Sequence, residues 1–334
     1  MGGSGEDRRP GEPEGSPVTT ADRRRILLVA HPRRQEAHDI ATDVVKRLHT
    51  AGIDVVMQPD EAATLGLTDH PGVWPATAKN PAEGCELICV LGGDGTILRG
   101  AEMSRGTGAP LLGVNLGHVG FLAEAEREDI SSTVEHIVAR TYTVEERMTL
   151  EVTAHVDGTP VYSSWALNEV TVEKANRERM LEVVAEVDGR PLTTWGCDGV
   201  VVATPTGSTA YAFSAGGPVV WPDVEALLLV PISAHALFAR PLVLGPHSHL
   251  ALEVVPDTLG TGALWCDGRR AVDLPPGARI QVVRSDTPVR LARLSTSPFT
   301  DRLVAKFDLN IHGWRGQARR EEAARTGRAS TIGP

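Results

Sequence analysis

Short apolar runs alternate with amphipathic stretches through the first 140 residues of the chain. The apolar runs predict buried strands at 26–30, 53–57, 87–91 and 111–115. Apolar residues at helical spacing predict helices at 35–50, 97–103 and 130–140. The Pro- and Gly-rich stretch 64–84 is expected to form a loop. Alternating strands and helices predict a parallel α/β sheet, and such sheets bind ligands at the carboxyl ends of their strands.

The hydrophobic pattern changes near Arg147. Residues 149–156 alternate between apolar and polar positions and are followed by Asp157-Gly158. The same format returns at 181–187 with Asp188-Gly189, and at 264–266 with Asp267-Gly268. A strand followed by Asp-Gly predicts a hairpin, so we expect an antiparallel β-rich region with three hairpin turns. The predicted division is an α/β domain at 25–147, a β-rich domain at 148–296, and disordered tails at 1–24 and 317–334.

Composition narrows the classes of partner. The 334 residues suffice for two domains, and a net charge of −10 makes a nucleic-acid partner unexpected. The sequence has neither an apolar run long enough to span a membrane nor the apolar segment of a signal peptide. The four cysteines lack zinc-site spacing and suit a reducing compartment. We therefore expect a cytoplasmic protein without a nucleic-acid or membrane partner.

A glycine-rich turn follows the predicted strand 87–91. It is Gly92-Gly93-Asp94-Gly95-Thr96, with Thr96 expected near the N-cap of the next helix. A strand, a glycine turn and a helix N-terminus present N–H groups and a partial positive charge to an anion. Asp94 would repel a phosphate, so it is expected to hold a metal ion or to accept a proton from a hydroxyl. The alternative is a tight turn with an exposed aspartate.

A second group of polar residues lies in the β-rich region. Residues 204–211, Thr-Pro-Thr-Gly-Ser-Thr-Ala-Tyr, carry four hydroxyl side chains that suit ribose and phosphate oxygens, unless they form a surface turn. Tyr211 could stack on a base or a nicotinamide ring. Asn168 and Glu169 interrupt a strand-like run. They either contact a ligand such as adenine or form a bulge at the end of the strand. Asp198, which precedes a predicted strand at 199–203, either turns a loop or binds a ligand.

Together these motifs, in this order and at these separations, resemble the NAD kinase family, with an actinobacterial character, from about residue 25 to residue 315. A Gly-Gly-Asp-Gly turn is shared with lipid kinases and phosphofructokinases, whereas the 204–211 run is far more specific. The resemblance implies a Rossmann-like parallel α/β domain followed by an antiparallel β-sandwich-like domain. It also implies that residues 297–316 return to the first domain. A lipid or sugar kinase and a catalytically silent dinucleotide-binding regulator are the alternatives.

The resemblance implies an activity and a set of ligands. The activity is transfer of the γ-phosphate of ATP, or of a phosphate from polyphosphate, to the 2′-hydroxyl of the adenosine ribose of NAD, giving NADP. A divalent cation such as Mg²⁺ would be bridged mainly by the donor phosphates. The family also implies a homo-oligomer, either a dimer or a tetramer.

The resemblance also assigns site residues. Asp94 matches the proton acceptor, Gly92, Gly93, Gly95 and Thr96 match the nucleotide-binding turn, and Arg99 could reach a phosphate. Asn168 and Glu169 match residues that bind NAD or the metal–phosphate group. Arg179 matches a basic ligand contact, and Asp198 matches a nicotinamide or ribose contact. The adenosine half would contact Thr209, Ala210, Tyr211, Ala212, Phe213 and Ser214. Some members have a lysine shortly before the Asp-Gly pair that matches Asp198-Gly199, where this chain has Trp195-Gly196-Cys197.

Overall fold

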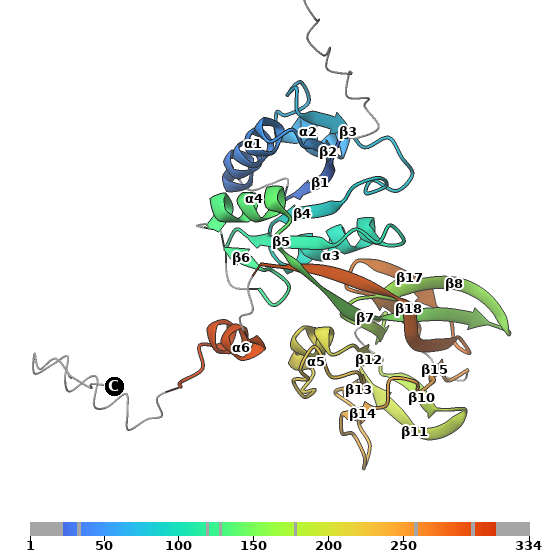
Figure 1. Ribbon diagram of the computed structural model, residues 1–334. Coiled ribbons are helices and arrows are strands. Elements are labelled where there is room, and N and C mark those ends of the chain that lie inside the picture. Colours follow the sequence, from blue (N-terminus) through green and yellow to red (C-terminus); the bar gives the residue numbers. More distant parts are fainter. Residues whose placement is uncertain are drawn as a thin grey trace, which may run out of the picture.

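The first half of the protein is a parallel sheet with helices on both faces (Figure 1). The computed structural model describes residues 23–31, 35–117, 120–126, 129–176, 179–256, 260–294 and 298–311. The strand order is β3-β2-β1-β4-β5, with a short β6 beside β5. These strands are β1 (Arg25–Ala30), β2 (Asp54–Met57), β3 (Val73–Pro75), β4 (Leu87–Leu91), β5 (Leu111–Asn115) and β6 (Ala125–Glu126).

Helices cover the two faces of this sheet because alternate strand residues point to opposite sides. The helices are α1 (Gln35–Thr50), α2 (Pro59–Thr64), α3 (Asp94–Ser104) and α4 (Ile130–Ala139). On one face, Ile26 and Leu28 pack with α1 and α4; on the other, Leu27 and Val29 pack with α3. The strands are therefore buried on both faces, as their continuous apolar runs predict. No helix in the described residues combines the length and apolar character needed to cross a membrane.

The second half is a sandwich of two antiparallel sheets that share one apolar core. One sheet has the order β14-β13-β12-β9-β16-β17, and the other contains β11-β10-β15-β18 with β7 and β8. The first eight strands are β7 (Thr143–Val156), β8 (Thr159–Ala166), β9 (Glu169–Lys174), β10 (Leu181–Val187), β11 (Arg190–Cys197), β12 (Gly199–Ala203), β13 (Leu227–Ile232) and β14 (Leu242–Leu244). The last four are β15 (Leu250–Val254), β16 (Gly262–Cys266), β17 (Arg270–Leu274) and β18 (Arg279–Arg293). The fold class expected from the sequence is thereby confirmed.

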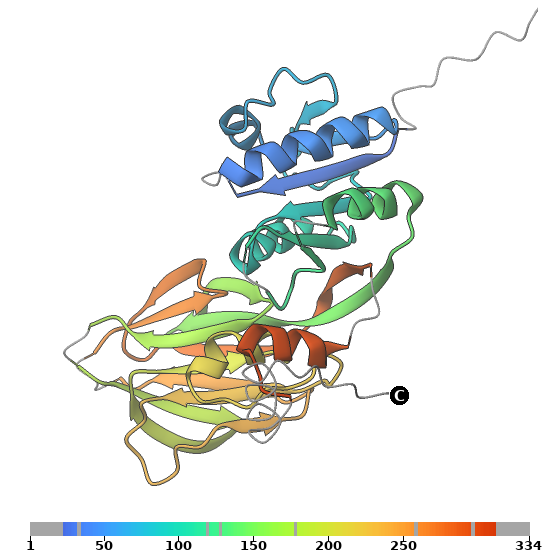
Figure 2. The same cartoon turned by 90° about the vertical axis from the view of Figure 1, so that its left-hand side faces the viewer.

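The two halves are joined by a strand pair that belongs to both of them (Figure 2). Strand β18 pairs with β15 in the sandwich and, at Leu291, in parallel with Leu111 of β5. Strand β7 runs antiparallel along β18 from Thr143 to His155. The predicted boundary between 147 and 148 falls inside β7, at the point where its pairing with β18 shifts register between Ser285 and Val289. The division into 25–147 and 148–296 stays a prediction.

The last described element contacts both halves. Helix α6 (Phe299–Phe307) lies beside α5 (Tyr211–Ser214) in both views (Figures 1 and 2). The ring of Phe307 lies 5.8 Å from that of Phe121 in the first half and 4.7 Å from that of Phe213 in the second. Arg302 Nη2 also donates to Glu124 Oε2 at 2.6 Å. Helix α6 therefore contacts the first half and the sandwich, and the return of residues 297–316 to the first domain stays a prediction.

Several predicted elements are confirmed and some boundaries are wrong. Helix 35–50 and the strands around 26–30, 53–57, 87–91 and 111–115 are present, and all three Asp-Gly pairs form hairpin turns. Helix α3 begins at Asp94 with Gly93 as its N-cap, three residues before the predicted start, because the glycine turn is already helical. The expected loop 64–84 contains β3, which pairs in parallel with β2.

The predicted N-terminal tail is too long by at least one residue. Arg24 is fixed, because its guanidinium donates to Glu86 and to the carbonyls of Ile137 and Val138 at the end of α4. A cation at a helix C-terminus is favourable, which explains why this arginine is ordered. Residues 1–22 and 317–334 of the predicted tails lie outside the described residues.

Helix α3 packs closely on the sheet at Gly100, and this contact is testable. A Cβ there would lie 2.6 Å from Val90 Cγ2 and 2.9 Å from Leu111 Cδ1. We expect Gly100→Ala to lower the free energy of unfolding by about 1–2 kcal/mol, because overpacking costs about 1–3 kcal/mol and the helix propensity of alanine offsets up to about 1 kcal/mol. Urea denaturation measures the change.

The control is Gly95→Ala in the same helix, where no described atom lies within 4 Å of the added Cβ. This variant should leave the free energy of unfolding unchanged or raise it. Equal stability of the two variants would contradict the close packing of α3.

Candidate active site

The glycine turn places Asp94 at the first residue of α3. Gly92 N donates to Val114 O at 2.9 Å, which ties the turn to β5. A Cβ on Gly92 would lie 2.5 Å from Thr96 Oγ1, so a side chain there would displace the first helical turn. The structure therefore presents the N-terminus of α3, with its N–H groups and partial positive charge, at the carboxyl edge of the sheet.

The carboxylate of Asp94 is held by the loop that follows β5. Leu122 N donates to Asp94 Oδ1 at 3.3 Å. A Cβ on Gly120 would lie only 2.5 Å from the same oxygen, so only glycine leaves room for the carboxylate in this orientation. Neighbouring parallel strands end at one edge of the sheet, which is why these two distant segments meet.

A cavity of about 410 Å³ opens in front of Asp94. Its lining includes two arginines: Arg99 from α3 and Arg269 from the turn between β16 and β17. Arg99 forms an ion pair with Glu61 and donates to Ala30 O at 2.8 Å. Burial raises the pKa of Glu61, while the charge of Arg99 opposes that rise. The cavity thus combines a helix N-terminus with two positively charged side chains, which Glu61 and Glu102 orient. The remaining lining residues are His31, Gly93, Gly95 and Thr96.

Asn168 and Glu169 form a buried polar corner between β8 and β9. Burial raises the pKa of Glu169 to about 8, the negative charge of Asp267 adds to the rise, and a hydrogen bond from Tyr211 N opposes it. Glu169 is therefore largely a neutral acid near pH 7. Its Oε2 atom is buried and has no hydrogen-bond partner among the described residues, so it could bond to a ligand.

The hydroxyl-rich segment is divided between folding and ligand-facing roles. The hydroxyls of Thr204 and Ser208 are both used internally: Thr204 Oγ1 donates to Leu167 O at 2.6 Å, and Ser208 Oγ bonds to both backbone groups of Val220. Both side chains are fully buried. Thr206 and Thr209, in the 3₁₀ turn at Thr206–Thr209, line a second cavity. The sequence-based interpretation that all four hydroxyls suit a ligand is therefore wrong for two of them.

The second cavity has a volume of about 480 Å³ and shares Leu122 with the Asp94 contact. Aromatic side chains form part of its wall, namely Phe121, Trp221 and Phe299. Its three arginines form ion pairs: Arg293 contacts both Glu124 and Glu145, Arg302 contacts Glu124, and Arg147 contacts Glu145. Burial lowers the pKa of Arg147 to about 10. The cavity therefore offers aromatic surface and arginines that carboxylates orient.

Helix α5 contributes the remaining segment expected at the adenosine half. Tyr211 bonds to Glu169 through its backbone N–H and leaves its ring partly exposed, and burial raises the pKa of its phenol. Phe213 packs on Phe307, whereas Ala212 is buried with Val201 and Leu228. The side chain of Ala212 thus faces the core. Ala210 separates the 3₁₀ turn from α5, and Ser214 ends α5.

The structure does not bring Asp198 to the buried corner. Strand β12 pairs antiparallel with β9, so that Gly199 lies opposite Glu173 and Ala203 opposite Glu169. Asp198 therefore lies at the far end of β12, roughly 16 Å along the strand from the corner. Its carboxylate pairs with Lys174 Nζ at 2.5 Å, and that contact lowers its pKa. Lys174 of β9 thus supplies an ammonium group beside this aspartate, although the chain lacks a lysine at 195–197.

Arg179 is not joined to the rest of the candidate site. It is exposed just before β10, and none of the contacts among the described residues links it to Asp94, Asn168 or Glu169. The structure therefore places Asp94 with Gly92, Gly93, Gly95, Thr96 and Arg99, and it places Asn168 and Glu169 with Tyr211.

Sequence reasoning missed four residues near the site. Gly120 and Leu122 position Asp94, Arg269 lines its cavity, and Asp267 bonds to the backbone of the corner. Asp267 occurs in an Asp-Gly pair that looks like the other two. Only the two arginines that follow it set this turn apart in the sequence.

The sheet edge, the glycine turn and the buried corner together indicate a phosphotransferase that acts on a nucleotide. The model of the ATP-NAD kinase N-terminal domain matches residues 26–142, and that of the ATP-NAD kinase C-terminal domain matches residues 167–294. The chain belongs to the NAD kinase family and is a kinase. The resemblance given by the motifs is confirmed, and the family decides against a lipid or sugar kinase.

Named relatives agree with this assignment. NAD kinase 2 of Streptomyces avermitilis is 58% identical over 299 residues, which cover 90% of this chain and 99% of that protein. NAD kinase of Thermobifida fusca is 59% identical over 302 residues, which cover 88% of this chain and 92% of that protein. These sources are actinobacteria, as the motifs indicate.

Solved structures share the fold. Yeast NADH kinase complexed with NADH superimposes with a TM-score of 0.78 at 26% identity, covering 86% of this chain and 89% of that chain. An NAD kinase from Archaeoglobus fulgidus in complex with ATP gives a TM-score of 0.66 at 25% identity, covering 86% of this chain and all of that chain.

The contact between Gly120 and Asp94 makes a prediction about turnover. In Gly120→Ala the new Cβ would meet Asp94 Oδ1, so the carboxylate must rotate away from Leu122 N. We expect NADP formation to slow at least about tenfold, because small displacements of a reacting group are costly to rate. Steady-state assays with NAD and ATP measure this effect.

The matched control is Gly245→Ala, at an exposed glycine where no described atom lies within 4 Å of the added Cβ. It should retain normal turnover. Full activity of Gly120→Ala would show that the loop yields and does not position Asp94.

Proposed function

We propose that this NAD kinase transfers the γ-phosphate of ATP to the 2′-hydroxyl of the adenosine ribose of NAD, giving NADP. The observation that carries the proposal is the place of Asp94. Its carboxylate stands at a helix N-terminus, beside a cavity with two arginines, and bonds to Leu122, which also lines the aromatic cavity. A phosphate donor on one side of Asp94 and an adenosine on the other side would meet at this carboxylate.

The donor phosphates are assigned to the cavity in front of Asp94. Gly92, Gly93, Gly95 and Thr96 would bind them through the N-terminal turn of α3, and Arg99 would add positive charge at the edge. Phosphoryl transfer has a loose transition state, so positioning and charge neutralisation supply most of the rate. The ATP complex of the Archaeoglobus fulgidus relative supports ATP as the donor. Inorganic polyphosphate is the second candidate donor, and parallel assays with the two donors distinguish them.

A divalent cation fits this cavity only when the donor phosphates bind it. The described residues contain no group of three or more His, Cys, Asp or Glu side chains that could hold a metal ion. Mg²⁺ is commonly held by substrate phosphates with few protein ligands. We therefore propose that the donor phosphates bring Mg²⁺ to the site. It would neutralise phosphate charge there, while Arg99 and the helix N-terminus orient the same phosphates.

The acceptor NAD is assigned to the corner and to the segment after the 3₁₀ turn. Asn168 offers an amide to the adenosine, and Glu169 offers a buried carboxyl oxygen that has no bond within the described residues. The adenosine contacts would come from Thr209, Ala210, Tyr211, Phe213 and Ser214, and Ala212 would contribute its backbone. Arg179 would supply a basic contact to NAD, and Asp198 would contact its nicotinamide or ribose. A dimer or tetramer stays a prediction.

The proposed role of Asp94 predicts a loss of turnover without a loss of binding. Asp94→Asn removes the proton acceptor but keeps the size of the side chain. We expect kcat to fall by about 10²–10⁴-fold, because general-base catalysis commonly contributes that much, and we expect NAD affinity to change little. The measurement is kcat together with direct titration of NAD.

The control for Asp94→Asn is Asp129→Asn at the N-cap of α4, where no side-chain capping bond is present. Near-normal kcat in Asp94→Asn would refute the base assignment. A collapse of NAD affinity with normal kcat would make Asp94 a binding residue instead.

The exposed position of Asp198 predicts an effect on binding. Asp198→Ala should raise the KM for NAD by about tenfold and lower kcat less, since a hydrogen bond to a charged group contributes about 1.5–3 kcal/mol. Initial-rate assays over a range of NAD concentrations measure both constants. An unchanged KM for NAD would remove Asp198 from the binding site and leave it as the partner of Lys174.

A further inference from the structure

The three Asp-Gly turns share a backbone conformation but differ in burial. Asp157, Asp188 and Asp267 have φ values of 51°, 51° and 53°. Asp157 and Asp188 are exposed, whereas Asp267 is 6% exposed. A hairpin turn requires only a residue that tolerates positive φ, so the turn itself does not require a buried carboxylate. Because burying a carboxylate is costly unless it is bonded, the contacts of Asp267 must compensate for its burial.

The carboxylate of Asp267 accepts three successive backbone N–H groups. Asn168 N and Glu169 N donate to Oδ1 at 2.7 and 3.3 Å, and Leu167 N donates to Oδ2 at 3.0 Å. Burial raises the pKa of Asp267, and these donors and Arg270 oppose the rise. Asp267 N in turn donates to Glu169 O at 2.9 Å. The turn thus fixes the peptide units from which the side chains of Asn168 and Glu169 project.

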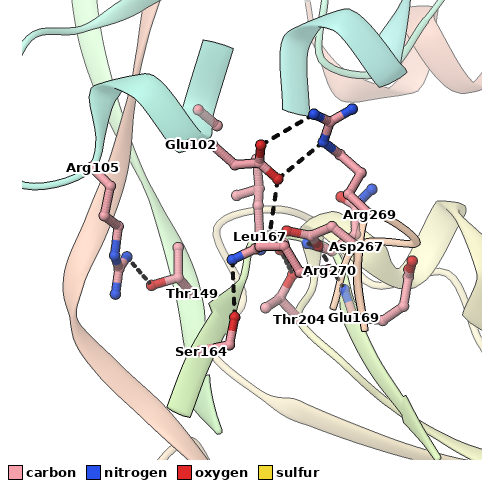
Figure 3. A network of polar contacts seen from close by, with 12 residues as sticks. Glu102, Arg105, Thr149, Ser164, Leu167, Glu169, Thr204, Asp267, Arg269 and Arg270 are labelled. Carbon is pink, nitrogen blue, oxygen red and sulfur yellow. Dashed lines mark hydrogen bonds and ion pairs between the residues drawn. The ribbon is translucent and has the colours of Figure 1, made fainter. Parts of the chain in front are cut away.

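An ionic chain continues from Asp267 to the helix that carries Asp94 (Figure 3). Arg270 Nη2 donates to Asp267 Oδ2 at 2.9 Å, and Arg270 Nε lies 3.2 Å from Glu102 Oε1. Arg269 binds both oxygens of Glu102, at 3.0 and 3.1 Å. Glu102 belongs to α3, which begins at Asp94. The same hairpin turn therefore contacts the corner and the catalytic helix.

We propose that Asp267 is a positioning residue: its carboxylate holds the 167–169 corner and, through Arg270, Arg269 and Glu102, fixes that corner relative to the helix of Asp94. The inference rests on the proposed function, because it concerns the residues assigned to NAD. Without the carboxylate, three buried N–H groups lose a charged acceptor, and the side chains of Asn168 and Glu169 lose their orientation. The donor turn at Gly93–Thr96 does not share these peptide units, and Arg269 in the donor cavity keeps its own bonds to Glu102, so the effect should fall on NAD.

The test is Asp267→Asn, which keeps the size of the side chain and replaces one accepting oxygen by an amino group. We expect the KM for NAD to rise at least tenfold and the KM for ATP to stay within twofold of wild type. The matched control is Asp157→Asn, the same substitution in a turn of the same conformation, and both of its KM values should match wild type. A folded Asp267→Asn protein with an unchanged KM for NAD would overturn the proposal, even if its melting temperature were lower.

A second variant covers the case in which Asp267→Asn does not fold. Glu102→Gln changes a partly exposed side chain and leaves the N–H bonds of the corner in place. We expect its KM for NAD to rise at least threefold, because the corner loses one link of the chain of contacts that joins it to α3. An unchanged KM for NAD in Glu102→Gln would overturn the coupling to α3.

Direct binding separates this proposal from the proposed function. If the wild-type protein formed no NADP, the proposed function would fail, and equilibrium dialysis of NAD would still test the positioning role. At least tenfold weaker NAD binding to Asp267→Asn than to wild type would support it, and equal binding would overturn it.

Discussion

The pairing of β18 with β7 is the interaction on which the arrangement of the whole site depends. The β7–β18 ladder runs from the β-sandwich to the edge of β5, with one shift of register between Ser285 and Val289, so the two halves share a sheet and are not linked only by loops. Strand β4, which leads to Asp94, is the neighbour of β5. Strand β7 leads through β8 to the corner at Asn168 and Glu169. Both parts of the site are therefore built outward from the same strand pair.

Buried carboxylates then set the orientation of the functional groups. Glu61 holds Arg99, Glu124 joins Arg293 to Arg302, and Asp267 holds the corner. An ion pair in a buried setting adds little net stability, because desolvation offsets the attraction, but breaking one leaves an unpaired charge. These pairs therefore serve to fix side-chain positions more than to stabilise the fold. Glu169, whose pKa burial raises to about 8, is the exception that keeps an oxygen free of bonds within the described chain.

The sequence predicts those features that depend on local pattern. Five buried apolar residues specify β4, and Asp157-Gly158 specifies a hairpin, because each is encoded by adjacent residues. The pattern fails where a partner distant in sequence decides the outcome. The strand β3 is only three residues long and exists because β2 offers it a parallel edge. Thr204 looks like a ligand hydroxyl until Leu167 O is found beside it. The sequence does not show that Asp198 and Asn168 lie at opposite ends of one strand pair, which the register of β9 and β12 decides.

The corner at Asn168 and Glu169 shows how such long-range contacts make a binding surface from an irregular segment. Strand β8 ends there and β9 begins there, so the backbone groups between the two strands lie outside the regular ladders and need other partners. Asp267 accepts the N–H groups of 167–169, while Thr204 binds Leu167 O through its hydroxyl and Asn168 O through its N–H. Gly207 packs so close to Asn168 O that a Cβ there would lie 2.0 Å away. With its backbone satisfied on both sides, the corner can present its side chains in a fixed direction, although Leu167 and Asn168 lie outside the strands.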